Sequence, residues 1–233
     1  MELVKSSQKN KRAVKPVKYH KEQFEKINDE KRNRIIDAAL AEFSSMGYNA
    51  ANINVIAKKA GISIGSMYQY FESKENLFLT IMDEAYRVIE GAISRIENRE
   101  GSLYDKLDQI IHYVQKYSRE YKLLNQVYLE ATTQGLAQIS KKLSNKMETI
   151  SSAYYKTLLN AAVKDGTADS GINTDTAAFC IDNIILLLQF SYSSAYYGER
   201  MKIFAGKNSH REDERIREEI MYLLKKAFSP GEK

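Results

Sequence analysis

Residues 35–78 read IIDAALAEFSSMGYNAANINVIAKKAGISIGSMYQYFESKENLF, a series of short helical patterns separated by glycine-containing turns. The first pattern starts slightly earlier, at residue 29, where Asp29 is expected to cap a helix. Gly47 is expected to end that helix, because glycine readily adopts the left-handed conformation found at helix C-termini. The apolar residues of this helix recur at helical spacing: Ile36, Ala39, Leu40 and Phe43.

Two shorter helices are predicted after this one. Residues 52–61, NINVIAKKAG, have Asn52 or Asn54 as a cap and a terminal Gly61. Ser63 then caps a helix in which Met67 and Phe71 are spaced to face a core. A bracing helix followed by two short helices and an intervening glycine turn is typical of a helix-turn-helix unit.

The outward face of the third helix has the composition of a DNA-reading surface. Glycine at residue 65 lacks a β-carbon, so the backbone there can approach a base or phosphate closely. Gln69 is suited to read adenine, Ser66 offers a hydroxyl, and Ile64 can contact a thymine methyl. The alternative for Gly65 is a tolerated small residue that makes no contact.

Phosphate contacts are expected from the residues around this helix. Tyr68 and Tyr70 carry hydroxyls on rigid rings, and Lys74 begins the next helix after the expected cap Ser73. Tyr70 could instead pack its ring over the first helix. Lys74 could be an ordinary solvated lysine.

Residues 35–78 resemble the DNA-binding domain of the TetR family of bacterial transcriptional regulators, with the shared pattern IA..AG.S.G..Y.YF.SKE.L. The resemblance implies an all-α, cytoplasmic regulator of double-stranded DNA, by family habit a repressor. The family often has threonine at the start of the second helix, where this chain has asparagines. By this resemblance the DNA contacts would come from Asn52, Ile53, Asn54, Ile64, Gly65, Ser66, Tyr68, Gln69, Tyr70 and Lys74.

The net charge of +5 lies in residues 1–28, which contain eight Lys and Arg against three Glu. This composition predicts a disordered basic leader, and an arm lying along a polyanion is the alternative. The leader is longer than the family usually carries. The expected organisation is therefore a basic leader (1–28), a helix-turn-helix domain (29–76) and a helical domain (77–233).

The rest of the chain predicts a helical bundle that forms a homodimer. Apolar residues repeat at helical spacing over 103–117 and 143–158, 122–134 form a shorter helix, and Thr174 can cap a helix reaching about Gly198. That helix is apolar on two sides, so one side could meet a partner. TetR relatives dimerise through their last two helices, and a two-fold dimer would read a palindromic operator. The predicted interface comprises Ile184, Leu187, Ser191, Ile216, Ile220 and Leu223.

Eleven of the sixteen tyrosines lie between residues 86 and 197. In the family, helices here enclose an effector cavity, which predicts ligand contacts from Tyr113, Tyr117, Tyr128 and Tyr154. Phenol groups in an apolar cavity suit a lipophilic or aromatic small molecule. Two alternatives stay open, that these tyrosines only fill the core and that the protein is a DNA-binding dimer without an effector.

Catalysis and cofactor binding are not expected. The histidines His20, His112 and His210 are scattered, Cys180 lies in a run that predicts a buried helix, and no phosphate-binding glycine loop occurs. One cysteine excludes an intramolecular disulfide. The start, MELVKSSQKN, has no apolar run typical of a signal peptide, and the longest apolar run, residues 184–190, is too short for a membrane span.

Overall fold

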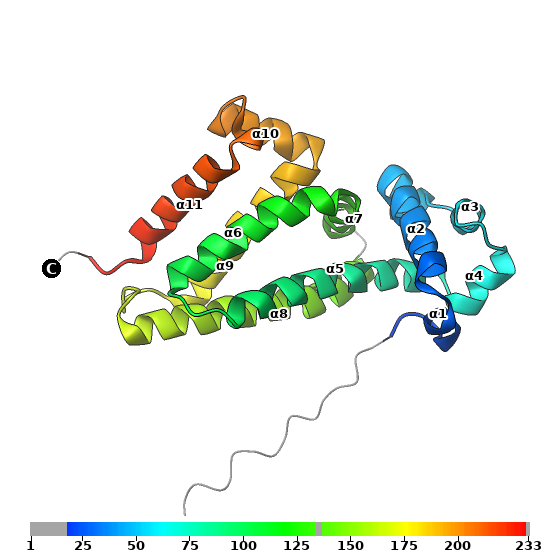
Figure 1. The fold of residues 1–233 in the computed structure, drawn as a ribbon, viewed down its shortest axis with the longest axis horizontal. Coiled ribbons are helices and arrows are strands. Elements are labelled where there is room, and N and C mark those ends of the chain that lie inside the picture. The colour runs from blue at the N-terminus through cyan, green and yellow to red at the C-terminus, as the bar shows by residue number, and fades with distance from the viewer. Residues whose placement is uncertain (1–17, 134–136, 232–233) are drawn as a thin grey trace, which may run out of the picture.

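The computed structural model describes residues 18–133 and 137–231, and within those ranges every regular element is a helix. The predicted all-α fold is confirmed, with a helix-turn-helix unit at the N-terminal end and a helical domain after it (Figure 1). The helices are α1 (Glu22–Lys26), α2 (Asp29–Ala50), α3 (Ile53–Lys59), α4 (Ile64–Tyr70), α5 (Lys74–Glu97), α6 (Leu103–Glu120), α7 (Lys122–Thr133), α8 (Ala137–Asp165), α9 (Thr174–Ser193), α10 (Ala195–Ala205), the 3-10 turn η1 (Ser209–Arg211) and α11 (Asp213–Phe228).

The bracing helix α2 begins one residue earlier than the sequence indicates. Its cap is Asn28, whose side-chain oxygen accepts the backbone N–H of Lys31 at 2.9 Å, so the expected cap Asp29 is instead the first helical residue. The helical path breaks at Gly47, where φ is 73° and ψ is 165°, as the sequence predicts. A further turn then runs to Ala50.

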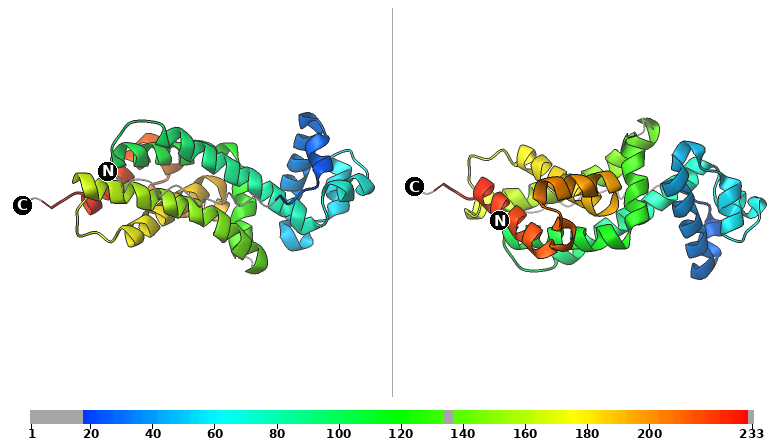
Figure 2. Two further views of the ribbon diagram at one scale, coloured as in Figure 1. Left: turned by 90° about the horizontal axis from the view of Figure 1, so that it is seen from below. Right: turned by 90° about the horizontal axis from the view of Figure 1, so that it is seen from above.

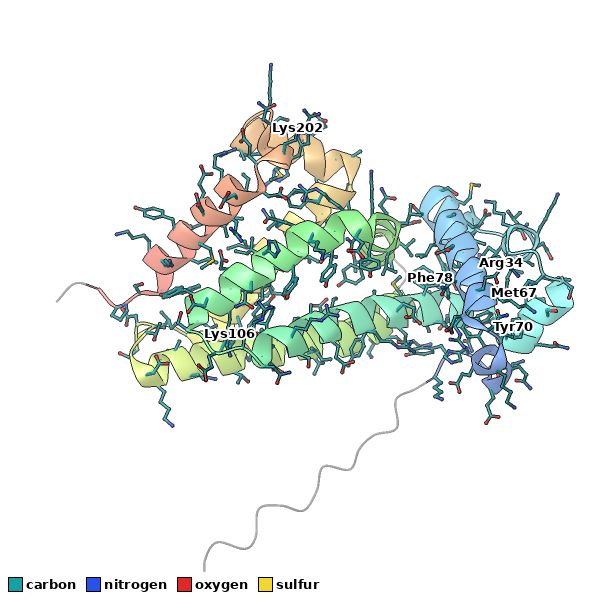
Figure 3. All side chains as sticks on the ribbon, in the orientation of Figure 1. Arg34, Met67, Tyr70, Phe78, Lys106 and Lys202 are labelled. Carbon is teal, nitrogen blue, oxygen red and sulfur yellow. The ribbon has the colours of Figure 1, made fainter. Side chains whose placement is uncertain are left out.

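Around α2, the helices α3 and α4 share a core with the start of α5. The residues that fill it are almost fully buried, and Met67 and Phe78 are labelled at this end of the molecule in Figure 3. Burial of such large side chains stabilises each by about 1.5–3 kcal/mol relative to exposure. The main core residues here are Ile35, Phe43, Ile56, Met67, Phe71, Leu77 and Phe78.

Part of the predicted disordered leader is folded. Phe24 of α1 is buried, and its ring centroid lies 4.7 Å from that of Phe71 and 5.9 Å from that of Tyr70. The prediction of disorder is therefore wrong for residues 18–28, because one aromatic side chain anchors this short basic segment to the core. Residues 1–17 of the predicted leader lie outside the described residues.

Helix α5 joins the two parts of the molecule without a break. Its buried residues from Leu77 to Ala85 belong to the N-terminal core, and Ile96 near its end belongs to the second core. The expected boundary between residues 76 and 77 therefore falls inside a helix, and a division of the chain there stays a prediction. Figure 2 shows α1–α4 gathered at one end of the molecule, with α5 extending from there along the remaining helices.

The second core lies among α5, α6, α8, α9 and α11. Helix α9 is central, since it packs against α6, α7, α8 and α10. It ends at Ser193, and α10 begins at Ala195 after an extended Ser194, so the single helix predicted to reach Gly198 is instead two. The predicted cap Thr174 is also displaced by one residue, because the Asn173 side chain accepts the N–H of Thr176.

Among the described residues, α9 alone has the length and apolarity of a membrane-spanning helix, with a mean hydropathy of 1.2 over 18 consecutive residues. It meets this test by length and composition only, as the core helix of a helical bundle also does. The contacts of α9 with four neighbouring helices explain its apolar composition, since a central bundle helix is apolar on several sides.

Candidate nucleic-acid interface and ligand cavity

The turn between α3 and α4 is fixed by capping groups. Asn52 and Ser63 cap the two helices by accepting the backbone N–H groups of Asn54 and Ser66, at 2.9 and 3.0 Å, so both predicted caps are confirmed. Between them, Gly61 has φ 68°, a conformation that favours glycine. The turn therefore holds α4 at a fixed angle to α3.

A buried carboxylate that the sequence pattern did not indicate supports the start of α3. Glu42 is 4% exposed, accepts the N–H of Asn52 at 3.3 Å and pairs with the Lys59 ammonium at 2.9 Å. The hydrogen bond from Lys59 holds the pKa of Glu42 below its usual value. Its position beside Phe43 on the inner face of α2 is the signal that could have identified it.

The outward face of α4 is open to solvent. Ile64 and Tyr68 are 38% and 48% exposed, and Gly65 and Gln69 are also exposed. Ser66 is half-buried, and its hydroxyl lies 2.9 Å from the hydroxyl of Ser63. The predicted base-reading residues thus lie together on one short helix, with Ser66 partly engaged in the cap.

Within residues 18–133 and 137–231, nothing requires glycine at residue 65. A β-carbon added there would meet only the Ser63 hydroxyl, at 3.8 Å, which is an ordinary contact. The helix would fold as well or better with alanine. A contact of Gly65 with another molecule stays a prediction.

Tyr70 points into the protein, and the packing alternative for its ring is confirmed. The residue is 6% exposed, and the Lys31 ammonium lies 5.4 Å from its ring centroid. Lys21 of the leader donates to the carbonyls of Tyr68 and Tyr70, at 3.0 and 2.9 Å, which ties α1 to the end of α4. A phosphate contact by the Tyr70 hydroxyl stays a prediction.

Lys74 does not fit the alternative of an ordinary solvated lysine, because its ammonium group is bound within the chain. Its ammonium donates to the carbonyls of Asn49 and Ala51, at 3.0 and 3.1 Å, and lies 5.0 Å from the ring centroid of Tyr48. It therefore joins the start of α5 to the end of α2, which leaves one N–H for any phosphate.

The flanking residues Asn52, Ile53 and Asn54 stand at the N-terminus of α3. Asn52 and Asn54 are exposed and Ile53 is half-buried. The side-chain oxygen of Asn52 is used by the cap, so the polar groups left for an outside partner are its amide N–H groups and the Asn54 side chain.

A cavity of about 160 Å³ lies among α5, α6, α7, α8 and α9. The four tyrosines predicted to bind a ligand, Tyr113, Tyr117, Tyr128 and Tyr154, all line it. The rings of Tyr113 and Tyr117 are stacked, with centroids 5.6 Å apart and planes 8° apart. The apolar part of the wall includes Ala85, Ile89, Ala92, Ile93 and Ile96 of α5.

Two carboxylates that the sequence pattern did not indicate, Glu148 and Asp182, also line this cavity. The Tyr128 hydroxyl donates to Glu148 at 2.9 Å. Burial, with the nearby Glu148 charge, raises the pKa of Asp182. They come from α8 and α9, and only the packing of those helices brings them to one wall.

Buried hydroxyls line the same space. Burial, reinforced by Glu97, raises the pKa of Tyr154 to about 12, and burial likewise raises the pKa of Tyr128 and Tyr155. Tyr154 is 5% exposed, and within the described residues its hydroxyl has no hydrogen-bond partner. Buried hydroxyls are normally paired, so this one is available to a ligand.

The predicted dimer residues lie along an apolar groove on α9, α10 and α11. Leu187 and Leu223 are well exposed, and Ile184, Ser191 and Ile220 are half-buried. Ile216 also borders the groove, but it is 5% exposed and packs into the chain's own core, so its part in a dimer interface stays a prediction.

The contribution of α10 to this groove was not predicted, because the sequence pattern indicated one continuous helix where the structure has α9 and α10. Phe204 lines the groove and is 76% exposed, and Ile203 beside it is also exposed. Cys180 of α9 is exposed as well, so the prediction that it is buried is wrong.

Among the described residues, no group of three or more His, Cys, Asp or Glu is placed to hold a metal ion. The candidate functional features are the exposed face of α4, the cavity among α5, α6, α7, α8 and α9, and the groove on α9, α10 and α11.

The sequence model for "Bacterial regulatory proteins, tetR family" matches residues 35–81. The HTH-type transcriptional repressor KstR of Mycolicibacterium smegmatis is 27% identical over 124 residues, which cover 51% of this chain and 61% of that protein. The HTH-type transcriptional regulator HbdR of Aromatoleum sp. is 40% identical over 80 residues, 31% of this chain and 35% of that protein. The chain thus spans about three fifths, or less, of these relatives.

Solved structures share the fold over most of the chain. The ketosteroid transcriptional regulator KstR2 of Mycobacterium tuberculosis has a TM-score of 0.66 at 14% identity, covering 88% of this chain and 98% of that one. FadR of Bacillus subtilis, solved with stearoyl-CoA, has a TM-score of 0.63 at 20% identity, covering 82% and 96%. The relatives are regulators of transcription, which fits a role other than catalysis.

Proposed function

Because the chain belongs to the TetR family of bacterial transcriptional regulators, we propose that it is a cytoplasmic, ligand-responsive repressor. It binds a palindromic operator as a homodimer and releases it when a small lipophilic or aromatic effector fills the cavity. No cofactor or membrane takes part.

The continuity of α5 is the observation that carries this proposal. Lys74 in its first turn holds the end of α2, beside the helix-turn-helix core. Four turns further on, Ile89, Ile93 and Ile96 line the cavity. A ligand that prefers one position of this helix would therefore change the placement of the DNA-binding end.

On the DNA side, α4 enters the major groove with Gln69, Gly65 and Ile64 toward the bases. Tyr68 and the Lys74 region contact phosphates, together with Asn52, Ile53 and Asn54 at the start of α3. The exposure of this face and the absence of an internal need for Gly65 support the assignment. Phosphate contacts supply affinity, and the few base contacts supply specificity.

The dimer forms through the groove on α9, α10 and α11. Leu187, Phe204 and Leu223 are between 43% and 76% exposed, and contiguous apolar exposure of this kind marks an interface. In a two-fold dimer the same patch serves both copies, and two reading helices about 34–36 Å apart match successive major grooves.

The relatives' ligands favour a lipophilic effector. One structural relative is named for ketosteroid regulation and another was solved with stearoyl-CoA. The second candidate function, a DNA-binding dimer without an effector, would leave the cavity as a packing gap. The Tyr154 hydroxyl disfavours it, because this hydroxyl is buried without a hydrogen-bond partner among the described residues, and a purely structural cavity would have no use for such a donor.

Selection of genomic DNA fragments by the full-length protein tests the proposal. We expect a palindromic consensus, a dimer in solution, and loss of both dimer and tight DNA binding in Leu223→Glu. Met46→Glu, which alters an exposed methionine of α2 away from the groove, is the matched control and should remain dimeric. A monomeric protein with unaltered affinity for a non-palindromic site would contradict the proposal.

A further inference from the structure

The cavity wall has an electrostatic character that its aromatic lining does not explain. Glu148 and Asp182 both border it, and none of the described residues lining the cavity is Lys, Arg or His. Two carboxylates in a partly buried space without a cation disfavour each other's ionisation. The raised pKa of Asp182, due first to burial and then to the Glu148 charge, is the consequence.

The described groups around the cavity compensate for little of this charge. The Tyr128 hydroxyl donates one hydrogen bond to Glu148. A hydrogen bond with the Ser151 side chain lowers the pKa of Asp182 and so partly offsets the effect of burial. Arg95 binds the Tyr117 hydroxyl at 2.8 Å, but it is exposed and lies outside the cavity lining. A cation brought by a ligand would supply what the wall lacks.

The remaining wall suits the rest of such a ligand. The stacked rings of Tyr113 and Tyr117 offer aromatic faces, which attract both apolar groups and cations. The Tyr154 hydroxyl is buried, without a partner among the described residues, and lines the same space. A cavity of about 160 Å³ is close to the ~150 Å³ at which an engineered apolar cavity holds one benzene ring.

We propose that the cavity selects a lipophilic cation, an aromatic or alkyl amine whose ammonium group lies against Glu148 and Asp182 and whose apolar body packs on the tyrosines. This rests on the proposed function in taking the cavity as the effector site. It also sets the chain apart from the relative solved with stearoyl-CoA, because a coenzyme A thioester carries phosphates that these carboxylates would repel.

Three probes with one apolar skeleton and different charge test the inference: phenylbutylamine, phenylbutanol and phenylbutyrate. Each is titrated into the full-length protein by calorimetry, with its shift in melting temperature as a second measure. We expect the amine to bind at least about tenfold more tightly than the alcohol, and the carboxylate to bind most weakly.

Two conservative variants assign the preference to its residues. Glu148→Gln and Asp182→Asn should each bring the ratio of amine to alcohol affinity toward one. Asp175→Asn is the matched control, because Asp175 lies two turns earlier on α9, outside the cavity lining, and pairs with Lys156 at 3.0 Å. Its ratio should equal that of the unaltered protein.

The outcomes separate this inference from the proposed function. An amine that binds no more tightly than the alcohol, or a set of probes of which none binds, overturns the cation preference. If the alcohol still weakens binding to the selected DNA, the ligand-responsive repressor stands without it. If the amine shows its preference but leaves DNA binding unchanged, the cation site stands and the repressor mechanism fails.

Discussion

The carboxylate of Glu130 on α7 occupies the place that a β-carbon on Gly47 of α2 would take, and it accepts the backbone N–H of Tyr48 at 3.3 Å. A second contact reinforces this junction, since the Ser44 hydroxyl donates to Gln126 of α7 at 2.8 Å. The DNA-binding end is therefore joined to the bundle through α2 and α7 as well as through α5.

Gly47→Ala should lower the free energy of unfolding by more than Gly61→Ala does. Both glycines have positive φ, so each substitution costs about 1–2 kcal/mol in backbone conformation. Only at Gly47 must Glu130 also move, whereas a β-carbon at Gly61 meets nothing within 4 Å. Chemical denaturation of the two variants measures the difference, and equal losses would refute the steric part of the explanation.

Gly65→Ala should separate stability from DNA binding. The substitution removes the helix penalty of glycine, so stability should rise by up to about 1 kcal/mol, while operator affinity falls because the added methyl blocks close approach. Gly91→Ala is the control, since Gly91 lies within α5 in open space. Denaturation and DNA titration provide the two readings, and unchanged operator affinity in Gly65→Ala would remove the proposed approach.

Gln69→Ala and Lys74→Ala should weaken DNA binding in different ways. Gln69→Ala should relax base preference at one position per half-site, by about 1–3 kcal/mol, with little effect on stability. Lys74→Ala should weaken all sequences and also lower protein stability by about 1 kcal/mol, because the carbonyls of Asn49 and Ala51 lose their donor. Fragment selection and thermal unfolding distinguish them; an unchanged consensus in Gln69→Ala would show that it reads no base.

Two separate changes in the leader distinguish a role in stability from a role in DNA binding. Phe24→Ala, or deletion through residue 25, should cost about 3–5 kcal/mol of stability, since the Phe24 ring is buried against Phe71. Deletion of residues 1–17 should leave thermal unfolding unchanged, so it alone tests whether the basic segment touches DNA. A reduced salt dependence of binding would reveal such a contact, and unaltered binding would show a passive leader.

Asp182→Asn should raise the melting temperature near neutral pH. Burial raises the pKa of this carboxyl in the folded protein, so its ionised form disfavours folding, and this penalty is fully present above the raised pKa. The gain over the unaltered protein should therefore be largest above the raised pKa and shrink as pH falls toward the ordinary aspartate pKa of about 3.9. Exposed Asp37→Asn is the control, and a gain independent of pH would contradict the burial explanation.

Local signals in the sequence were sufficient for the DNA-binding end. The caps Asn52 and Ser63, the break at Gly47 and the inward Met67 depend on short-range chemistry, and the structure has them as predicted. The folding of residues 18–28 was missed because it depends on one aromatic contact with α4, a long-range feature that composition does not record.

In the bundle, periodicity predicted helices but not what their packing brings together. The cavity tyrosines follow a family pattern, whereas Glu148 and Asp182 meet only through the crossing of α8 and α9. The break at Ser194 carries no glycine or proline, so α10 and the exposed Phe204 were merged into the preceding helix.

A small tilt of helix α5 about one end would displace its other end by several ångströms. Its 24 residues extend about 36 Å at 1.5 Å per residue, from the DNA-binding core to the far wall of the cavity. A tilt of about 5° around the cavity end would displace its first turn by about 3 Å, close to the ~3.4 Å rise of one base-pair step. A tilt of this size would therefore change the position of the DNA-binding end by about the length of one base-pair step.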